Sequence, residues 1–338
     1  MKGPLRTAVV ICSSIFFSLL GQNQGDVQLP LHEQKILRVA EQIDIFQNAD
    51  NIIINEVEGG LTNQNYKVSI GPSSYFFRSS TGNNDFLGCS LEREWIITNK
   101  VSEVGLAPKV IFYSEMDRIL VTDFIETVGT KVDLHDPLTM QKVGRSVSLL
   151  HHLTISFPTE FCPFETIKKY IETASTNGID LPNNLIHIVL PYINSLQKII
   201  PLTIAYSKTP THLDLHAGNI LDDGQNLWLI DWEYAAMGDP FFDLATMASI
   251  EVLSNNEMNE LLQYYLEDKN PSPEMTLYFY EMRIVADTRW ALWCYLQAKL
   301  SPISASFNER GDVYLQQCLE RIIKLDIGSE DLISKKSK

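Results

Sequence analysis

A change of pattern near residue 126 is the feature that most constrains the fold of this chain. Before it, five short β-rich runs are separated by turn sequences, at 52–57, 66–70, 74–78, 109–113 and 118–124. Helical spacing occurs at 31–46 and 91–104 in this first part, and almost everywhere after Glu126. The sequence therefore predicts an α+β protein with a small five-stranded antiparallel β lobe and a larger, mainly helical lobe.

Residues 1–25 form a segment that differs from both lobes. Lys2 and Arg6 precede an apolar stretch at 8–20 that has the form of a signal peptide and is too short to span a bilayer. Export and membrane association stay open, and stable membrane insertion is not expected. The five cysteines are an odd number without a Cys-x-x-Cys pair, which favours reduced thiols and a cytoplasmic protein.

The charge balance excludes one class of partner. The chain has 42 acidic and 27 basic residues, with a formal net charge of -15. Sequence-independent nucleic-acid binding depends on neutralising phosphates, so we expect no nucleic-acid partner. An acidic surface favours small cationic partners, although it also serves solubility alone. We expect a monomer or a homodimer.

The densest polar cluster lies at 211–219, and a second acidic group follows an apolar strand pair at 229–233. Phosphoryl transfer needs a carboxylate that accepts a hydroxyl proton and oxygen ligands that hold Mg²⁺ on nucleotide phosphates. Asp214 suits the role of base, while the Asn219 amide oxygen and the Asp231 carboxylate suit the roles of metal ligands. The pattern indicates a phosphotransferase with Asp214 as its catalytic residue.

Two other interpretations of this cluster stay open. Both aspartates also suit turns, because Asp commonly bounds a turn next to Gly and Asn. His212, Asp214 and His216 carry ligand types that suit zinc, although no second histidine pair of matching spacing lies nearby. His151 and His152 end an amphipathic helix, which indicates a helix-end feature rather than metal ligands.

Several motifs, in order, resemble the aminoglycoside phosphotransferase and choline kinase superfamily. They are His212-x-Asp214 followed by Asn219, Ile-Asp-Trp-Glu at 230–233, and Gly-Asp-Pro-x-x-Asp-Leu-Ala at 238–245. The second motif is similar to the choline/ethanolamine kinase branch. The resemblance runs from about Val57 to Gln297. It implies a protein-kinase-like fold, with a nucleotide-binding lobe at 26–126 and a catalytic and substrate-binding lobe at 127–338.

The resemblance also assigns residues of the first lobe to the nucleotide. Gly59, Gly60, Leu61, Thr62 and Asn63 resemble the nucleotide loop, where glycines let backbone N–H groups approach phosphates. Arg78 resembles the basic residue of the third strand. Glu94 is its expected partner, and Lys67 and Glu92 are the rival candidates. A plain hairpin turn and an exposed Arg and Glu are the alternatives.

Asp123, Phe124 and Ile125 end the last predicted strand of the first lobe. Backbone groups of Asp123 and Ile125 are expected to hydrogen-bond the edge of an adenine ring. The alternative is a simple linker between the lobes, and the two interpretations are compatible because such binding uses only the backbone.

Trp290 and Trp293 stand at i and i+3, so both indoles project from one face of a predicted helix. Aromatic faces hold a quaternary ammonium by cation–π attraction. The alternative is ordinary core packing. Trp-x-x-Trp-x-x-x-Gln-Ala-Lys resembles the choline-binding helix of choline kinases, and Glu233 is expected to add a negative charge for a cationic head group.

Together these features imply a kinase of a small amino alcohol that depends on ATP and Mg²⁺, with choline as first substrate and ethanolamine as second. A thiamine or aminoglycoside kinase of the same fold is one alternative. A non-catalytic choline-binding protein is the other, although a protein that had lost catalysis would not need all three of Asp214, Asn219 and Asp231. The signal-like N-terminus is foreign to an enzyme that uses ATP.

Overall fold

The computed structural model describes residues 7–10, 30–47, 49, 51–57, 63–80, 90–129, 131–203, 207–267, 269–301 and 306–336. The chain divides into two compact units. The first is Met1–Val128 with Leu221–Tyr234, and the second is Gly129–Ile220 with Ala235–Lys338. The segment Leu221–Tyr234 lies within the range that the sequence assigned to the helical lobe. One reason for its place in the first unit is that the Leu229 N–H donates to the carbonyl oxygen of Leu106 at 2.7 Å.

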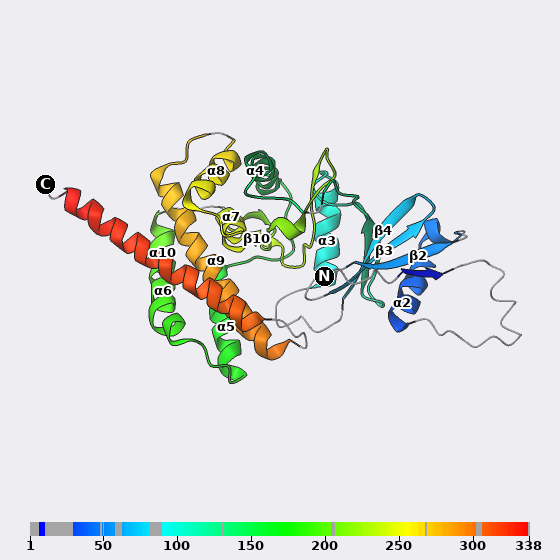
Figure 1. The fold of residues 1–338 in the computed structure, drawn as a ribbon, viewed down its shortest axis with the longest axis horizontal. Coiled ribbons are helices and arrows are strands. Elements are labelled where there is room, and N and C mark those ends of the chain that lie inside the picture. The colour runs from blue at the N-terminus through cyan, green and yellow to red at the C-terminus, as the bar shows by residue number, and fades with distance from the viewer. Residues whose placement is uncertain are drawn as a thin grey trace, which may run out of the picture. The chain divides into compact units, whose positions relative to one another are not determined.

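The first unit contains an antiparallel sheet in the strand order β1-β2-β3-β4-β6-β5 (Figure 1). Its strands are β1 (Thr7–Val10), β2 (Ile52–Val57), β3 (Asn63–Ile70), β4 (Ser73–Ser80), β5 (Val110–Ser114) and β6 (Ile119–Asp123). The five strands predicted from the sequence are all present and adjacent. The sixth, β1, pairs with β2 at the edge and comes from the signal-like segment.

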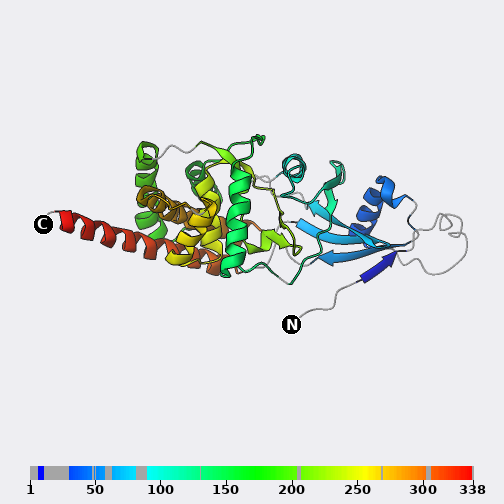
Figure 2. The same cartoon turned by 90° about the horizontal axis from the view of Figure 1, so that it is seen from above.

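Two helices lie on opposite faces of this sheet. Helix α2 (Leu31–Ala40) packs with Phe77 of β4 in an apolar core that also includes Val68 and Val121 (Figure 2). Successive residues of a strand point to opposite faces, so Arg78 faces the other side. There α3 (Leu91–Ser102), whose first turn is capped by Ser90, supplies the partner of Arg78. The alternation in one strand thus separates the core from the candidate site.

A short hairpin completes the first unit. Strands β8 (Ile220–Asp222) and β9 (Leu227–Leu229) pair with each other. The turn between them is built by Asp223, whose carboxylate accepts the backbone N–H groups of Gln225 and Asn226. The Trp232 indole N–H donates to the carbonyl oxygen of Leu229 at 3.0 Å, which fixes the chain just after β9.

The second unit is mainly helical, as predicted. Its helices are α4 (Pro137–His151), α5 (Pro163–Thr176), α6 (Leu190–Thr203), α7 (Pro240–Ile250), α8 (Asn255–Tyr265), α9 (Pro273–Leu300) and α10 (Phe307–Lys336). A π-helical turn, Leu185–Val189, leads into α6. The two-stranded pair β7 (Thr209–Thr211) and β10 (Ala236–Gly238) flanks the polar segment of the sequence.

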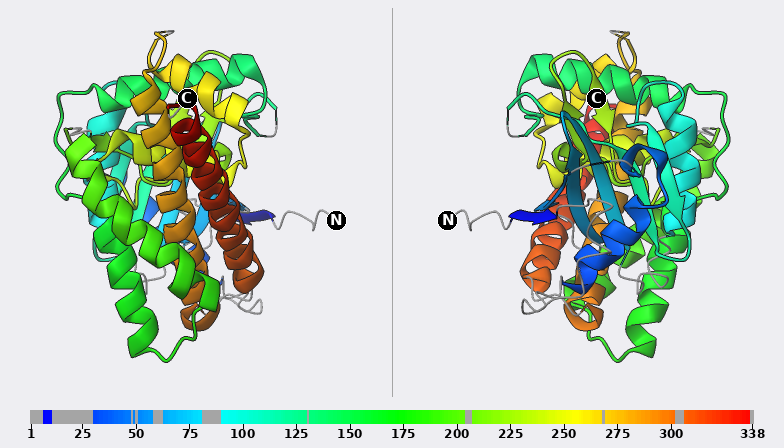
Figure 3. Two further views of the ribbon diagram at one scale, coloured as in Figure 1. Left: turned by 90° about the vertical axis from the view of Figure 1, so that its left-hand side faces the viewer. Right: turned by 90° about the vertical axis from the view of Figure 1, so that its right-hand side faces the viewer.

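Helix α9 forms the centre of this unit and packs against α5, α7 and α10 (Figure 3). Its residues from Met282 to Gln297 are all buried. One buried ion pair holds α10 to it, because Arg321 Nε lies 3.1 Å from Asp287 Oδ2, and Ser249 of α7 donates to the same carboxylate. The side chains of this buried stretch are therefore fixed from several directions. Among the helices that the structure describes, none is long and apolar enough to cross a membrane.

Candidate active site

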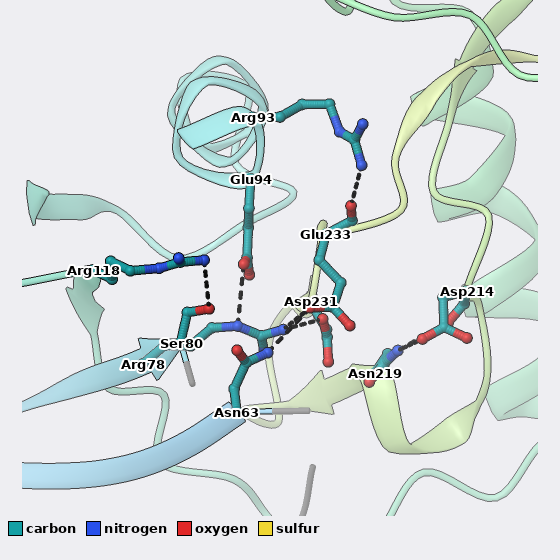
Figure 4. Close-up of polar contacts among 10 residues, drawn as sticks. All are labelled: Asn63, Arg78, Ser80, Arg93, Glu94, Arg118, Asp214, Asn219, Asp231 and Glu233. Atoms are coloured by element: carbon teal, nitrogen blue, oxygen red, sulfur yellow. Dashed lines mark hydrogen bonds and ion pairs between the residues drawn. The ribbon is translucent and has the colours of Figure 1, made fainter. Parts of the chain in front are cut away.

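Arg78 is the centre of a buried ionic cluster in the first unit (Figure 4). Its Nε lies 3.1 Å from Glu94 Oε2, and its Nη2 lies 2.6 Å from Asp231 Oδ1 and 3.1 Å from Glu233 Oε2. The side chains of Arg78, Glu94 and Glu233 are 6%, 4% and 8% exposed, and that of Asp231 is 20% exposed. One guanidinium thus serves three carboxylates, and the cluster carries excess negative charge.

The backbone at Asp231 helps to bring these groups together. Asp231 has φ of 68°, a left-handed conformation that is uncommon for a residue other than glycine. It lies two residues after the end of β9, so the chain turns there and both Asp231 and Glu233 reach Arg78. Such strain persists where surrounding contacts fix the backbone, and it is frequent at functional sites.

The structure also shows the surroundings of the other residues predicted to bind the nucleotide. Asn63 Nδ2 donates to Glu233 Oε2 at 3.1 Å, which places Asn63 beside the cluster. Gly59, Gly60 and Thr62 lie outside the described residues. The rival Lys67 forms an ion pair with Glu126, and its Nζ lies 4.3 Å from the centre of the Phe124 ring. Glu92 is exposed, so the partner of Arg78 on α3 is Glu94.

Asp123 and Ile125 stand at the end of β6 and just beyond it. The Asp123 N–H donates to the carbonyl oxygen of Lys109 at 2.9 Å, and the Phe124 N–H donates to Ser74. Burial raises the pKa of the Asp123 carboxyl. Neighbouring strands therefore hold this segment, and its role toward an adenine ring stays a prediction.

Sequence reasoning missed Arg93. Its Nη2 donates to the backbone carbonyl oxygen of Glu233 at 2.5 Å, so α3 bonds the acidic segment through Arg93 and bonds Arg78 through Glu94 (Figure 4). The two partners are 140 residues apart in the sequence. Adjacent charges of opposite sign at the start of a helix gave no signal for such a contact.

Burial and the charge excess of the cluster both raise the pKa of Glu94. Burial raises the pKa of Glu94 to about 8, and the nearby carboxylates of Asp231 and Glu233 act in the same direction, while Arg78 acts against it. A proton on Glu94 therefore relieves part of the repulsion within the cluster.

We expect this proton to make stability depend on pH. A carboxyl whose folded pKa is above its unfolded value favours the native state at low pH, and that stability is lost as pH rises from about 4.5 to about 8. Urea unfolding of the protein without nucleotide, at several pH values in this range, measures the effect. Glu94→Gln cannot lose a proton and should show a weaker decline. Parallel curves for the two proteins would contradict the assignment.

In the second unit, Asp214 and Asn219 form a pair of their own (Figure 4). The Asn219 Nδ2 donates to the Asp214 carbonyl oxygen at 2.9 Å and to Asp214 Oδ2 at 3.1 Å. The amide nitrogen is therefore directed at Asp214, and the amide oxygen is left for another partner. A short helical turn, Ala217–Asn219, sets this spacing, and His216 Nδ1 caps it by accepting the Gly218 N–H.

Asp243 holds the backbone just before Asp214, a role that sequence reasoning did not assign. Its carboxylate is fully buried and accepts the N–H of His212 at 2.7 Å and that of Leu213 at 2.6 Å. Leu213 has φ of 67°, so this stretch is held in an unfavourable conformation. In the sequence, Asp243 belongs to the Gly-Asp-Pro-x-x-Asp-Leu-Ala motif at 238–245, near the start of α7 and after the Asp239 cap.

The zinc interpretation of His212, Asp214 and His216 has no support from the geometry. Among the described residues, no group of three or more His, Cys, Asp or Glu side chains is arranged to hold a metal ion. His212 is fully buried, and His216 serves as a helix cap.

Trp290 and Trp293 lie together on α9. Their ring centres are 5.6 Å apart in an edge-to-face arrangement, and Trp293 also meets Phe307 of α10 at 5.7 Å. Each Trp is 6% exposed. The Arg289 guanidinium lies 4.0 Å from the centre of the Trp290 ring, so the chain's own cation already covers that ring. The pair is thus well packed, and Phe307 is an aromatic neighbour that the sequence spacing did not reveal.

Comparison with known proteins relates this geometry to a family. A sequence model of the family described as choline/ethanolamine kinase matches residues 54–269. Protein LicA of Haemophilus influenzae is 24% identical over 238 residues, which cover 68% of this chain and 67% of that protein.

Solved structures with a similar fold cover most of the chain. A choline/ethanolamine kinase family protein from Mesorhizobium loti matches with a TM-score of 0.73 and 21% identity, over 86% of this chain and 94% of that chain. The choline kinase LicA from Streptococcus pneumoniae matches with a TM-score of 0.71 and 24% identity, over 87% and 99%. The predicted fold class is confirmed.

Proposed function

We propose that this chain transfers the γ-phosphoryl group of ATP to the hydroxyl of choline, with ethanolamine as the second acceptor. The proposal starts from the family: the chain belongs to the choline/ethanolamine kinase family and is a small-molecule kinase. The observation that carries this proposal is the Asp214–Asn219 pair. It joins a half-buried carboxylate to an amide whose oxygen is directed elsewhere. These are the groups that phosphoryl transfer to an alcohol requires.

Asp214 acts as the base in this proposal. The substrate oxygen forms a bond to phosphorus, the bond from phosphorus to the ADP oxygen breaks, and Asp214 accepts the hydroxyl proton. Asn219 holds one carboxylate oxygen of Asp214 and its backbone carbonyl, so the base has a fixed orientation before the substrate binds. Orientation of this kind lowers the barrier because it is already present when the reaction begins.

The donor chemistry of two residues fits Mg²⁺. Asn219 offers an amide oxygen, and Asp231 bonds Arg78 through Oδ1 only, so its Oδ2 has no protein partner among the described residues. Both are oxygen ligands, which Mg²⁺ prefers. Bound Mg²⁺ neutralises charge on the phosphate oxygens. Extra positive charge also suits a cluster in which Arg78 faces three carboxylates.

The nucleotide is assigned to the sheet unit. In the sheet unit, Arg78 and Asn63 are the polar side chains that we assign to the nucleotide, and both lie beside the acidic cluster. The loop with Gly59, Gly60 and Thr62 precedes Asn63 directly in the sequence. Glu94 and Asp231 hold the Arg78 guanidinium on two sides, which keeps it in one orientation. Backbone groups of Asp123 and Ile125 are assigned to the adenine ring.

The choline ammonium is assigned to the aromatic side chains of α9. Because Arg289 covers the Trp290 ring, we assign the larger share of the cation–π attraction to Trp293, with Phe307 beside it. Glu233 is assigned as the acidic group for the cation, although Arg78 and Asn63 already bond its carboxylate. The proposal therefore includes a change of partner, in which Glu233 leaves Arg78 and Asn63 and contacts the substrate cation.

A coupled assay of ADP release tests the function. The full chain is supplied with ATP and with choline, ethanolamine, thiamine or kanamycin, each with and without Mg²⁺. We expect turnover with choline, slower turnover with ethanolamine, and none without Mg²⁺. Turnover only with thiamine or kanamycin would show that choline is not the acceptor. Choline binding without any turnover would favour a non-catalytic choline-binding protein.

Trp293→Ala should raise the KM for choline and leave the KM for ATP unchanged. A cation–π contribution of about 0.5–2 kcal/mol corresponds to a factor of about 2 to 30 in KM. Trp293→Phe keeps an aromatic face and should raise the KM less. The Trp is buried, so the alanine variant should also lose stability, and both KM values must be measured below its melting temperature. A loss of stability with an unchanged ratio of the two KM values would leave core packing as the only role.

A further inference from the structure

Beyond the proposed function, a chain of buried hydrogen bonds extends from the Asp214 segment into the helical unit. Asp243 Oδ2, which accepts the His212 N–H, also lies 3.1 Å from His151 Nε2. His151 Nδ1 in turn lies 3.1 Å from the Tyr265 hydroxyl. Asp243, His151 and Tyr265 come from α7, α4 and α8, so three helices contribute one residue each.

The chemistry of these groups fixes the direction of the hydrogen bond between His151 and Asp243. An Asp243 carboxylate that already receives two backbone N–H groups accepts only, so the hydrogen between it and His151 is carried on Nε2. Nδ1 is then the ring atom that bonds the Tyr265 hydroxyl, which can act as a donor or as an acceptor. The Tyr265 ring also meets the His151 ring edge to face at 5.5 Å, which restricts rotation of the imidazole.

Because these groups are buried, water does not compete for their hydrogen bonds. His151 and Tyr265 are buried and Asp243 is fully buried, so solvent contributes little to their hydrogen bonding. A buried carboxylate that lost one donor would rotate or bind a water molecule. Its hydrogen bonds with the two N–H groups would then weaken. Those two N–H groups belong to His212 and to Leu213, which directly precedes Asp214 and has φ of 67°.

We infer that His151 and Tyr265 are positioning residues for the base, acting through Asp243 on the backbone before Asp214. The inference rests on the proposed function for its kinetic readout. Tyr265 holds the ring of His151, His151 holds one oxygen of Asp243, and Asp243 holds a left-handed turn that places the Asp214 carboxylate. Small displacements of a reacting group cost on the order of 10²-fold in rate, so a relay of this kind affects turnover more than binding.

The test compares His151→Leu with His151→Gln. Leucine removes the donor to Asp243, whereas the Gln Nε2 can replace the imidazole Nε2 as a donor. We expect kcat to fall about 10²-fold in His151→Leu, with the KM values for ATP and choline changed less than about threefold, and to recover at least tenfold of that loss in His151→Gln. Tyr265→Phe removes only the hydroxyl and should lower kcat several-fold without unfolding the protein.

His152→Leu is the matched control. His152 is the next residue, is exposed, and bonds through Nδ1 to the Ser148 carbonyl oxygen of its own helix at 2.7 Å. We expect its kcat to equal that of the wild type. Equal kcat in His151→Leu and His152→Leu, measured per folded molecule, would overturn the inference, as would a loss in His151→Leu that Gln does not restore.

Amide hydrogen exchange supplies a readout that needs no activity. In His151→Leu the N–H groups of His212 and Leu213 should exchange faster by more than tenfold, while amides in the middle of α9 keep their wild-type rates. Unchanged exchange at 212 and 213 would contradict the relay even if turnover fell. If the wild-type protein showed no turnover, the proposed function would be wrong. The exchange rates at 212 and 213 would still test whether His151 acts on this backbone through Asp243.

Discussion

Replacing Asp214 by Asn is expected to lower kcat by about 10²- to 10⁴-fold, because an amide does not accept the hydroxyl proton of the substrate. The change should preserve the local structure. An Asn side-chain oxygen at this position can still accept the Asn219 Nδ2, which now donates to Asp214 Oδ2 at 3.1 Å. Nucleotide affinity and melting temperature should therefore remain close to the wild-type values. Single-turnover kinetics with saturating ATP and choline measures the effect on the chemical step.

Asp180→Asn is the matched control for this variant. It makes the same chemical change at an exposed carboxylate in the connection after α5. We expect wild-type kcat. If Asp214→Asn also kept wild-type kcat, Asp214 would have no role as base, and the pair with Asn219 would be a structural feature of the turn.

Local patterns in the sequence were sufficient to predict most of the fold. The β-rich run at 74–78 predicted a strand, and the structure places the apolar core with Phe77 on one face of that strand and the ionic cluster with Arg78 on the other. The spacing of Asp214 and Asn219 is also local, because a single helical turn joins them. Features of this kind depend on residues within a few positions of one another, so a sequence contains them directly.

Contacts between distant segments were harder to predict. Glu233 was assigned to the substrate cation, and the structure shows its carboxylate bonded to Arg78 and Asn63. Arg93 and His151 gave no functional signal, because their partners lie 140 and 92 residues away. Such contacts depend on how helices pack against a loop, which periodicity alone does not specify. The residues that position a site are therefore less visible in a sequence than the residues that perform its chemistry.

The second large effect is expected for Arg78→Met, which removes the one cation among the described residues that bonds Glu94, Asp231 and Glu233 together. Breaking a buried ion pair from one side leaves uncompensated charge and typically costs about 3–5 kcal/mol. The Arg78 side chain is buried, so solvent does little to reduce this cost. We therefore expect the free energy of unfolding in urea to fall by about that amount, and turnover to be lost at temperatures where the protein remains folded.

Second-site changes separate charge from shape in this experiment. Glu233→Gln in the Arg78→Met background removes one carboxylate charge from the cluster, so it should restore part of the stability but none of the turnover, because the cation for the nucleotide is still missing. Arg78→Lys should recover stability without full activity, since one ammonium cannot match the contacts that Nε and Nη2 make with three side chains.

Arg118→Met, the same change at an exposed guanidinium 3.4 Å from the Ser80 hydroxyl, should alter stability by no more than about 0.5 kcal/mol. Equal stability of Arg78→Met and Arg118→Met would show that the three carboxylates do not need this cation, and the proposed role of Arg78 in organising the site would be wrong.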